Sequence, residues 1–172
     1  MLEVIKNRRS CRNFSSKEVE DSKIKEIINA GLLAPSGMGR QTPVIIAIKD
    51  KQVREELRKL NVSFSRWDAS FDPFYGAPVV LLVIANKNGL SVHDGAATME
   101  NMLLEATNQG LASCWIHRAD EEIQSDEGKK LLSFTGLNLD DYIGIGHVIV
   151  GYPNSENKIP DKVIKDGRVF IK

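Results

Sequence analysis

The chain has 172 residues, of which 42% are hydrophobic and 27% are charged, and its 23 basic and 23 acidic residues cancel at pH 7. This length and composition predict one folded domain with a sizeable core, and they exclude a disordered chain. Zero net charge argues against a nucleic-acid coat or a protein that binds acidic membranes.

The two cysteines, Cys11 and Cys114, lie far apart, which excludes a disulfide framework and a thiolate metal cluster. Residues 1–6 are too short and too charged to predict a signal peptide. The longest apolar run, residues 77–85, has the length of a strand and falls far short of a membrane span. We therefore expect a protein of the reducing cytoplasm that crosses no membrane.

A cluster of arginines follows a short amphipathic helix at the start of the chain. Arg8, Arg9, Ser10 and Arg12 place three guanidiniums and a hydroxyl within five residues of an otherwise neutral chain. Arginine offers a planar set of donors that matches phosphate oxygens, so the cluster predicts an anion clamp. A solvated basic helix end is the alternative, because arginine also suits the negative end of a helix dipole. These residues alone leave both open.

A longer helix is predicted from Val19 to Leu33, because apolar residues recur there with a period of 3.6. Ser16 is the expected start signal, and Gly31 and Pro35 are the expected stop signals.

The following segment, residues 34–43, contains two glycines and two prolines. It predicts a shaped loop whose backbone N–H groups can approach a flat or anionic ligand. An ordinary connection from helix to strand is the alternative. The segment lacks the GxxxxGK[ST] pattern of a phosphate loop.

The rest of the chain alternates between predicted strands and helices. Strands are expected at residues 44–48, 78–85, 113–116 and 142–150, and helices at 51–60, 91–108 and 125–132. The strand at 78–85 is apolar throughout and should be central. The helix at 91–108 is apolar around most of its circumference, which predicts a core helix that also serves a subunit interface. Gly144 and Gly146 predict a bulge or a close backbone approach in the last strand.

An aromatic segment, residues 61–75, should form either the wall or lid of a pocket or a flap packed on the core. The basic, loosely patterned residues 154–172 are expected to be an extended arm that reaches a partner surface.

No motif indicates catalysis by the protein's own side chains. The three histidines have no metal-site spacing, and His147 is expected to be a core histidine with its hydrogen bonds satisfied. There is no GxSxG elbow, and the Gly144-x-Gly146 pair lacks the third glycine and the helix of a dinucleotide fingerprint. The chemistry is therefore expected to belong to a cofactor.

Taken in order, five motifs resemble the FMN-dependent nitroreductase family, in particular its short members. The motifs are Arg8-Arg9-Ser10-x-Arg12, Ala34-Pro35-Ser36-Gly37-Met38-x-x-Gln41, Tyr75-Gly76-Ala77-Pro78-Val79-Val80, Gly110-Leu111-Ala112-Ser113-Cys114-Trp115-Ile116 and Gly146-x-x-x-x-Gly151-Tyr152-Pro153. Each is weak alone, but together they span nearly the whole chain in the right order and spacing.

This resemblance implies an α+β fold with a central mixed β-sheet flanked by helices. It implies one flavin-binding domain over residues 1–172, in an intertwined homodimer with two FMN sites at the interface. Residues 153–172 would be the arm that each subunit lays on its partner.

The resemblance also assigns cofactor contacts. Arg8, Ser10 and Arg12, with Arg9 in the same motif, would bind the FMN phosphate and the edge of the flavin ring. The partner-contributed loop against the ring would contain Pro35, Ser36, Gly37, Met38 and Gln41. The backbone that passes flavin N5 would be that of Trp115, Ile116, His117 and Arg118. Either Lys162 or Lys165 would reach the phosphate. Gly39, His117 and Arg118 depart from the residues of many relatives.

The implied activity is a ping-pong transfer of hydride from NADH or NADPH through FMN to nitroaromatics, quinones or similar small acceptors. No side chain is assigned a catalytic role, and no metal is expected. Two alternatives remain. One is a flavoprotein of the same fold with another chemistry, such as flavin breakdown or dehalogenation. The other is a non-enzymatic module that binds an anion or a nucleotide through the arginines.

Overall fold

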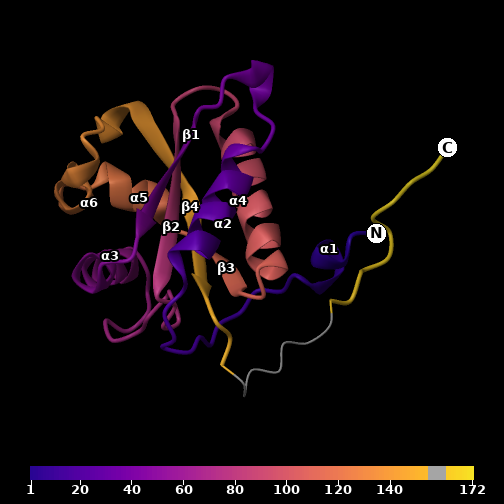
Figure 1. Cartoon of the computed structure of the whole chain (residues 1–172). Helices are drawn as coiled ribbons and strands as arrows, with labels where there is room; N and C mark the ends of the chain where they lie inside the picture. Colours follow the sequence, from indigo (N-terminus) through magenta and orange to yellow (C-terminus); the bar gives the residue numbers. More distant parts are fainter. Residues whose placement is uncertain (155–161) are drawn as a thin grey trace.

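Four strands form an antiparallel sheet at the centre of the computed structural model, which describes residues 1–154 and 162–172. The sheet has the order β1-β2-β4-β3 (Figure 1). Its strands are β1 (Pro43–Ile48), β2 (Val79–Asn86), β3 (Ala112–Ile116) and β4 (Tyr142–Gly151). The apolar strand β2 lies inside the sheet, as predicted. All strand pairs are antiparallel, and among the described residues the expected mixed character is limited to one parallel bridge, Ser10 with Ser113.

Helices cover both faces of the sheet (Figure 1). The alternating side chains of β2 are buried on both sides because each face meets its own helices. One face packs against α2 (Asp21–Leu32) and α4 (Ser91–Asn108), and the other against α3 (Lys51–Ser63), α5 (Ala119–Gln124) and α6 (Asp126–Leu131). The remaining helices are α1 (Glu3–Asn7), η1 (Gly37–Gly39), η2 (Ser133–Thr135) and η3 (Leu139–Asp141). No helix in the described part of the chain is long and apolar enough to span a membrane.

The start of α2 differs from the prediction. The helix begins at Asp21, and the residues just before it are extended. Tertiary contacts keep the residues before Asp21 out of the helix. The Ser15 N–H donates to the Tyr152 carbonyl at 2.9 Å, and Val19 packs in the core at 5% exposure. Ser16 therefore lies at a bend next to the residue that is tied to the end of β4, and it does not begin the helix.

The end of α2 also differs from the prediction. Gly31 lies inside the helix, and Leu33 is the residue that caps it. A Cβ at Gly31 would come within 2.8 Å of Met102 Cγ on α4. This glycine therefore permits α2 and α4 to pack closely and does not stop the helix.

The predicted bulge in β4 is confirmed. Gly146 pairs with Val83 and Gly144 pairs with Ile84, so Ile145 is an extra residue on β4. Gly144 also lies against the first turn of α5, where its N–H donates to Asp120 Oδ1 at 2.9 Å. The bulge thereby brings the start of α5 into contact with the sheet.

The last residues, 162–172, are exposed. Their large apolar side chains are at least 75% exposed; these are Val163, Ile164, Val169, Phe170 and Ile171. Residues 155–161 of the expected arm lie outside the described residues. Exposed apolar surface of this kind is typical of a segment that contacts a partner.

Gly144→Ala should lower the free energy of unfolding by about 2 kcal/mol, the usual scale for overpacking in a filled core. The new Cβ would lie 2.2 Å from the Ala119 carbonyl carbon. Gly89→Ala is the matched control, since a Cβ at Gly89 meets nothing within 4 Å. Chemical denaturation of both variants measures the difference, and equal stabilities would contradict this view of the bulge.

Candidate functional site

The candidate site is built on the outer edge of β3. One edge of this strand pairs with β4 over its full length. On the other edge, the described residues supply a single bridge, in which the Cys11 N–H donates to the Ser113 carbonyl at 2.9 Å. Backbone groups of a strand alternate in direction, so Trp115 faces the same edge as Ser113. The Ile116 carbonyl faces His147 of β4, so the His117 N–H faces the open edge too, whereas the His117 carbonyl accepts from Asn61. The backbone groups that face the open edge beyond Ser113 are therefore the N–H groups of Trp115 and His117, together with the Trp115 carbonyl, to which the Cys114 thiol donates at 3.6 Å.

The arginine cluster lies at the start of this open edge. Arg8 Nε is 3.8 Å from Glu100 Oε1 of α4, and the Arg8 side chain is only 19% exposed. Burial raises the pKa of the Cys114 thiol on β3, while the charge of Arg12 and a hydrogen bond with Ser10 act in the opposite direction. Both interactions require Ser10 and Arg12 to lie beside β3. The structure therefore brings the predicted clamp and the predicted backbone segment together.

Arg9 has a different environment from Arg8 and Arg12. Its Nη1 donates to the carbonyls of Lys6 at 2.6 Å and Arg8 at 2.8 Å, at the C-terminal end of α1. This is the basic helix end that the sequence left open as an alternative. Arg9 thus matches the helix-end interpretation, and the anion clamp stays a prediction for Arg8 and Arg12.

Beyond β3 the chain turns sharply at residues 116–118. Arg118 has φ 83° and ψ 4°, a left-handed conformation that glycine adopts most easily. Its guanidinium pairs with Glu121 Oε1 at 2.7 Å, which offsets part of the strain of the turn. Glycine is therefore the residue that this backbone favours, and here an arginine adds charge at the same place.

A hollow of about 700 Å³ lies next to this turn. It is lined by Asn61, Phe64, Ser65, Arg66, Trp67, Ile116, His117, Arg118 and Glu121. The aromatic segment contributes only its first part, Phe64 and Trp67, to this wall. A flat molecule at the turn would therefore meet aromatic surface and positive charge together.

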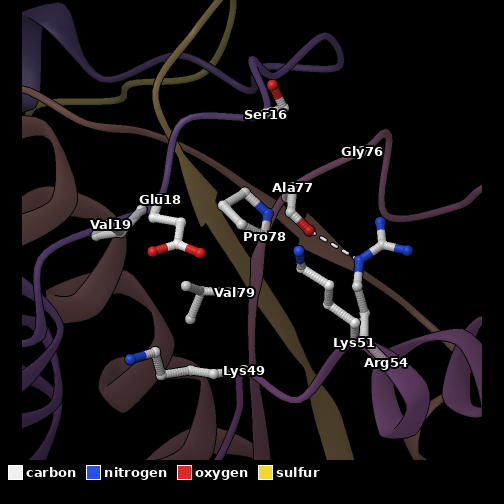
Figure 2. Close-up of a pocket in the computed structure, with 10 residues that line it drawn as sticks. All are labelled: Ser16, Glu18, Val19, Lys49, Lys51, Arg54, Gly76, Ala77, Pro78 and Val79. Carbon is white, nitrogen blue, oxygen red and sulfur yellow. Dashed lines mark hydrogen bonds between the residues drawn. The ribbon is translucent and has the colours of Figure 1, made fainter.

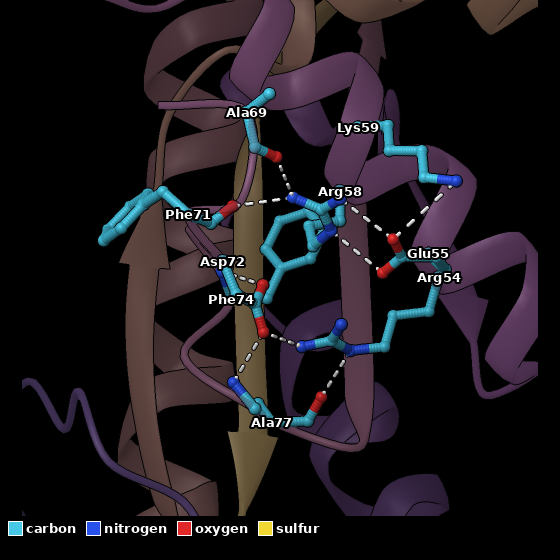
Figure 3. Close-up of polar contacts among 10 residues, drawn as sticks. Arg54, Glu55, Arg58, Lys59, Ala69, Phe71, Asp72, Phe74 and Ala77 are labelled. Atoms are coloured by element: carbon cyan, nitrogen blue, oxygen red, sulfur yellow. Dashed lines mark hydrogen bonds and ion pairs between the residues drawn. The ribbon is translucent and has the colours of Figure 1, made fainter. Parts of the chain in front are cut away.

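The second part of the aromatic segment is packed on the core, with Phe74 fully buried. Two arginines of α3 hold it there (Figure 3). Arg58 donates to the carbonyls of Ala69 and Phe71, and Arg54 donates to the Ala77 carbonyl and pairs with Asp72. The first part of the segment thus lines the hollow, and the second part is packed on the core. The hydrogen bonds to Arg54 and Arg58 hold the whole segment in place.

The loop at residues 35–41 is shaped as predicted. Met38, Gly39 and Gln41 all have positive φ. The Gly37 N–H donates to Asp94 Oδ1 at 2.9 Å, which ties the loop to the first turn of α4. The Met38 side chain is 84% exposed.

This loop is tied to the first turn of α4 through Asp94, whereas Arg8 reaches Glu100 in the middle of that helix, and α1 lies beside its other half (Figure 1). Within one chain, the structure therefore does not bring Pro35, Ser36, Gly37, Met38 and Gln41 to the clamp. Lys162 and Lys165 are exposed residues of the tail.

A second hollow, of about 330 Å³, lies on the β1–β2 side (Figure 2). Lys49 and Arg54 line it, but Lys49 pairs with Asp21, and Arg54 donates to the Ala77 carbonyl at 2.8 Å. This hollow contains none of the predicted site residues. Nor do the described residues contain any group of three or more His, Cys, Asp or Glu side chains placed to hold a metal.

Three buried polar residues lie behind the turn, Asn61, Glu122 and His147, and neither Asn61 nor Glu122 was singled out from the sequence. Only His147 was expected to have its hydrogen bonds satisfied inside the core, and this is confirmed by its contact with Glu122 at 2.7 Å. Two buried groups on β3, Ser113 Oγ and Trp115 Nε1, have no hydrogen-bond partner among the described residues. Buried polar atoms are nearly always hydrogen-bonded, so two unpartnered ones on a single strand are unusual.

Fold and site together define an α+β protein with an arginine cluster at a free strand edge. The chain belongs to the Nitroreductase family, whose profile matches residues 5–65 and 58–152.

Solved structures of similar proteins extend the likeness to the whole fold. A nitroreductase with bound FMN from Bacteroides fragilis is 29% identical, with a TM-score of 0.90, over 99% of this chain and 97% of that one. An FMN-dependent nitroreductase from Clostridium difficile R20291 is 27% identical, with a TM-score of 0.78, over 99% and 98% of the two chains. A relative from Archaeoglobus fulgidus, provisionally named an NADH dehydrogenase/NAD(P)H nitroreductase, is 28% identical over 90% of this chain and 86% of its own length.

Neither cysteine should react with DTNB at pH 8 while the chain is folded. Cys11 and Cys114 are 0% and 1% exposed, and the raised pKa of Cys114 keeps less of it as the reactive thiolate at that pH. Both thiols should appear on addition of denaturant. Rapid labelling of native protein at either position would contradict the packing of the clamp on β3.

Proposed function

We propose that this chain is an FMN-dependent oxidoreductase that transfers hydride from NADH or NADPH to nitroaromatics, quinones or similar small acceptors. The observation that carries the proposal is that Arg8 and Arg12 lie next to the open edge of β3. An anion clamp beside a row of backbone groups suits a ligand that combines a phosphate with a flat polar ring. Likeness to an FMN-bound nitroreductase over almost the entire chain supports the same cofactor.

The residues present fit FMN. Arg8, Ser10 and Arg12 would hold the phosphate, because charge-assisted hydrogen bonds from arginine are strong and directional. The unpartnered Ser113 hydroxyl lies on the strand that the clamp touches. The ring would then lie along Trp115, Ile116 and His117.

When bound, FMN would supply the redox chemistry, by accepting hydride from the nicotinamide and passing it to the acceptor. The protein would bind, orient and shield the reactants. Arg118 would place positive charge near the electron-rich end of the ring, and Phe64 and Trp67 would wall the space for the second reactant. One site would serve both half-reactions in turn, so this proposal gives no side chain the role of acid or base.

The proposed active form is a homodimer. The loop at residues 35–41 is anchored at the first turn of α4, about 9 Å of helix from the residue that Arg8 contacts, and a second copy would supply this loop to the site. Exposed apolar side chains support such an interface: Leu2, Ile5, Leu32, Leu33, Met38, Leu90 and Val92. Residues 1–172 would act as one flavin-binding domain, with residues 153–172 as the arm on the partner and Lys162 or Lys165 near the phosphate. A reducing cytoplasm would suit its two buried cysteines.

Arg12→Ala should weaken binding of FMN about tenfold to a hundredfold, the scale of one lost charge-assisted contact. Binding of riboflavin, which has no phosphate, should change little. Quenching of flavin fluorescence measures both affinities, and Lys25→Ala on the exposed face of α2 is the control.

The wild-type protein should be yellow after incubation with FMN and should lose this colour with NADH or NADPH in the absence of oxygen. Added nitroaromatic should restore the colour if that acceptor is used. A chain that takes up no flavin would refute the proposal. Equal loss of FMN and riboflavin affinity in Arg12→Ala would refute the phosphate clamp.

A chain that ends at Asn154 should shift from dimer to monomer, because the apolar tail and the surface it covers would no longer meet. Sedimentation velocity measures the change at matched concentrations of full-length and shortened protein. The double variant Val169→Ser, Phe170→Ser in the full-length chain should shift the equilibrium in the same direction. A stable dimer of the shortened chain would contradict the role of the arm.

A further inference from the structure

A buried polar network lies directly behind the turn at residues 116–118. Asn61, Glu122 and His147 are 1%, 0% and 0% exposed, and they come from α3, α5 and β4. The proposed hydride transfer uses none of them. Burying a carboxyl, an imidazole and an amide together is unfavourable unless all of them are hydrogen-bonded. Such a cluster therefore calls for a structural explanation.

The contacts of the network converge on two backbone carbonyls. Asn61 Nδ2 donates to Glu122 Oε1 at 2.5 Å and to the His117 carbonyl at 2.8 Å. His147 Nε2 lies 2.7 Å from Glu122 Oε2, and His147 Nδ1 lies 3.4 Å from the Ile116 carbonyl. Glu122 thus links the two side chains that reach the turn.

These carbonyls fix the direction of two N–H groups. The chain has no cis peptide bond among its described residues, so each C=O points opposite to the N–H of the same peptide unit. The Ile116 carbonyl faces β4 and its histidine, so the His117 N–H faces the open edge of β3. The His117 carbonyl faces Asn61, so the Arg118 N–H points away from α3.

The turn needs this support. Arg118 is held in a left-handed conformation that non-glycine residues rarely adopt. A bond from Asn61 to the peptide just before Arg118 opposes the rotation that would relax it. Without that bond, the Arg118 N–H would lose its fixed direction, even with the fold intact.

We propose that Asn61, Glu122 and His147 are positioning residues that hold the 116–118 turn so that the N–H groups of His117 and Arg118 are directed at the flavin ring. This inference rests on the proposed function, because it assumes that the ring lies along β3. The three residues touch neither cofactor nor substrate and act through the backbone. Their effect is therefore confined to the ring and does not reach the phosphate.

Asn61→Ala tests the network. The affinities for FMN and for riboflavin should both fall about tenfold, because hydrogen bonds to the ring would no longer be held in place. The visible absorption bands of the bound flavin should also shift. Asn101→Ala is the matched control, since Asn101 Nδ2 donates to the Ala30 carbonyl at 3.0 Å on the other face of the sheet. It removes a comparable bond and should leave affinity and spectrum unchanged.

Glu122→Gln is the conservative variant. It keeps an oxygen for Asn61 and a polar group for His147, so flavin affinity should stay within about twofold of wild type. If circular dichroism shows that Asn61→Ala is unfolded, Asn61→Ser replaces it. The same losses of FMN and riboflavin affinity are expected for that variant.

Three results separate the hypotheses. Wild-type protein that binds neither FMN nor riboflavin would refute the proposed function itself. Wild-type protein that binds FMN, together with a folded Asn61 variant of unchanged affinity and spectrum, would overturn only the positioning network. A loss confined to FMN would also overturn it, because the effect would then lie at the phosphate.

Discussion

The half-paired state of β3 is the constraint on which the rest of the site depends. The strand is only five residues long, and β4 covers one of its edges completely. On the other edge, Ser10 and Cys11 pair with Ser113, and the chain after Cys11 turns away from the strand. That single contact places the arginine cluster at one end of the open edge and fixes which backbone groups face outward along the remainder.

The position of α4 explains why one chain is not enough in the proposed function. Its first turn holds the loop at residues 35–41 through Asp94, and its middle meets Arg8 through Glu100. About 9 Å of helix separates these two residues, at 1.5 Å per residue. The helix therefore acts as a spacer that keeps the loop from the clamp of its own subunit. A second copy in an antiparallel arrangement would bring a loop to each clamp.

The fold was largely predictable where periodic patterns were long. The bounds of α4 agree with the sequence prediction, and the apolar run at residues 78–85 is the interior strand β2. Prediction was wrong where tertiary contact overrode a local signal. Ser16 resembles a helix start, yet the preceding Ser15 is bound to Tyr152. Gly31 resembles a helix end, yet it serves the packing of α2 on α4.

The site was predictable only in part. Arg8 and Arg12 could be read from local charge, and the family resemblance supplied the segment at residues 115–118. Arg9 differs from Arg8 and Arg12 in the direction of its guanidinium. The spacing of residues in the sequence does not reveal that direction. Asn61 and Glu122 lie 61 residues apart in the sequence and meet in the core. No local pattern marks such a pair, because its partners are set by how α3 and α5 pack.

The central claim is that the flavin ring lies along the open edge of β3. A crystal structure of the protein with FMN tests this claim most directly. The account predicts the phosphate beside Arg8 and Arg12, with the His117 N–H within hydrogen-bonding distance of the ring and the 35–41 loop of a second copy on its far side. FMN bound instead in the hollow between Lys51 and Pro78, or at a site remote from β3, would contradict it.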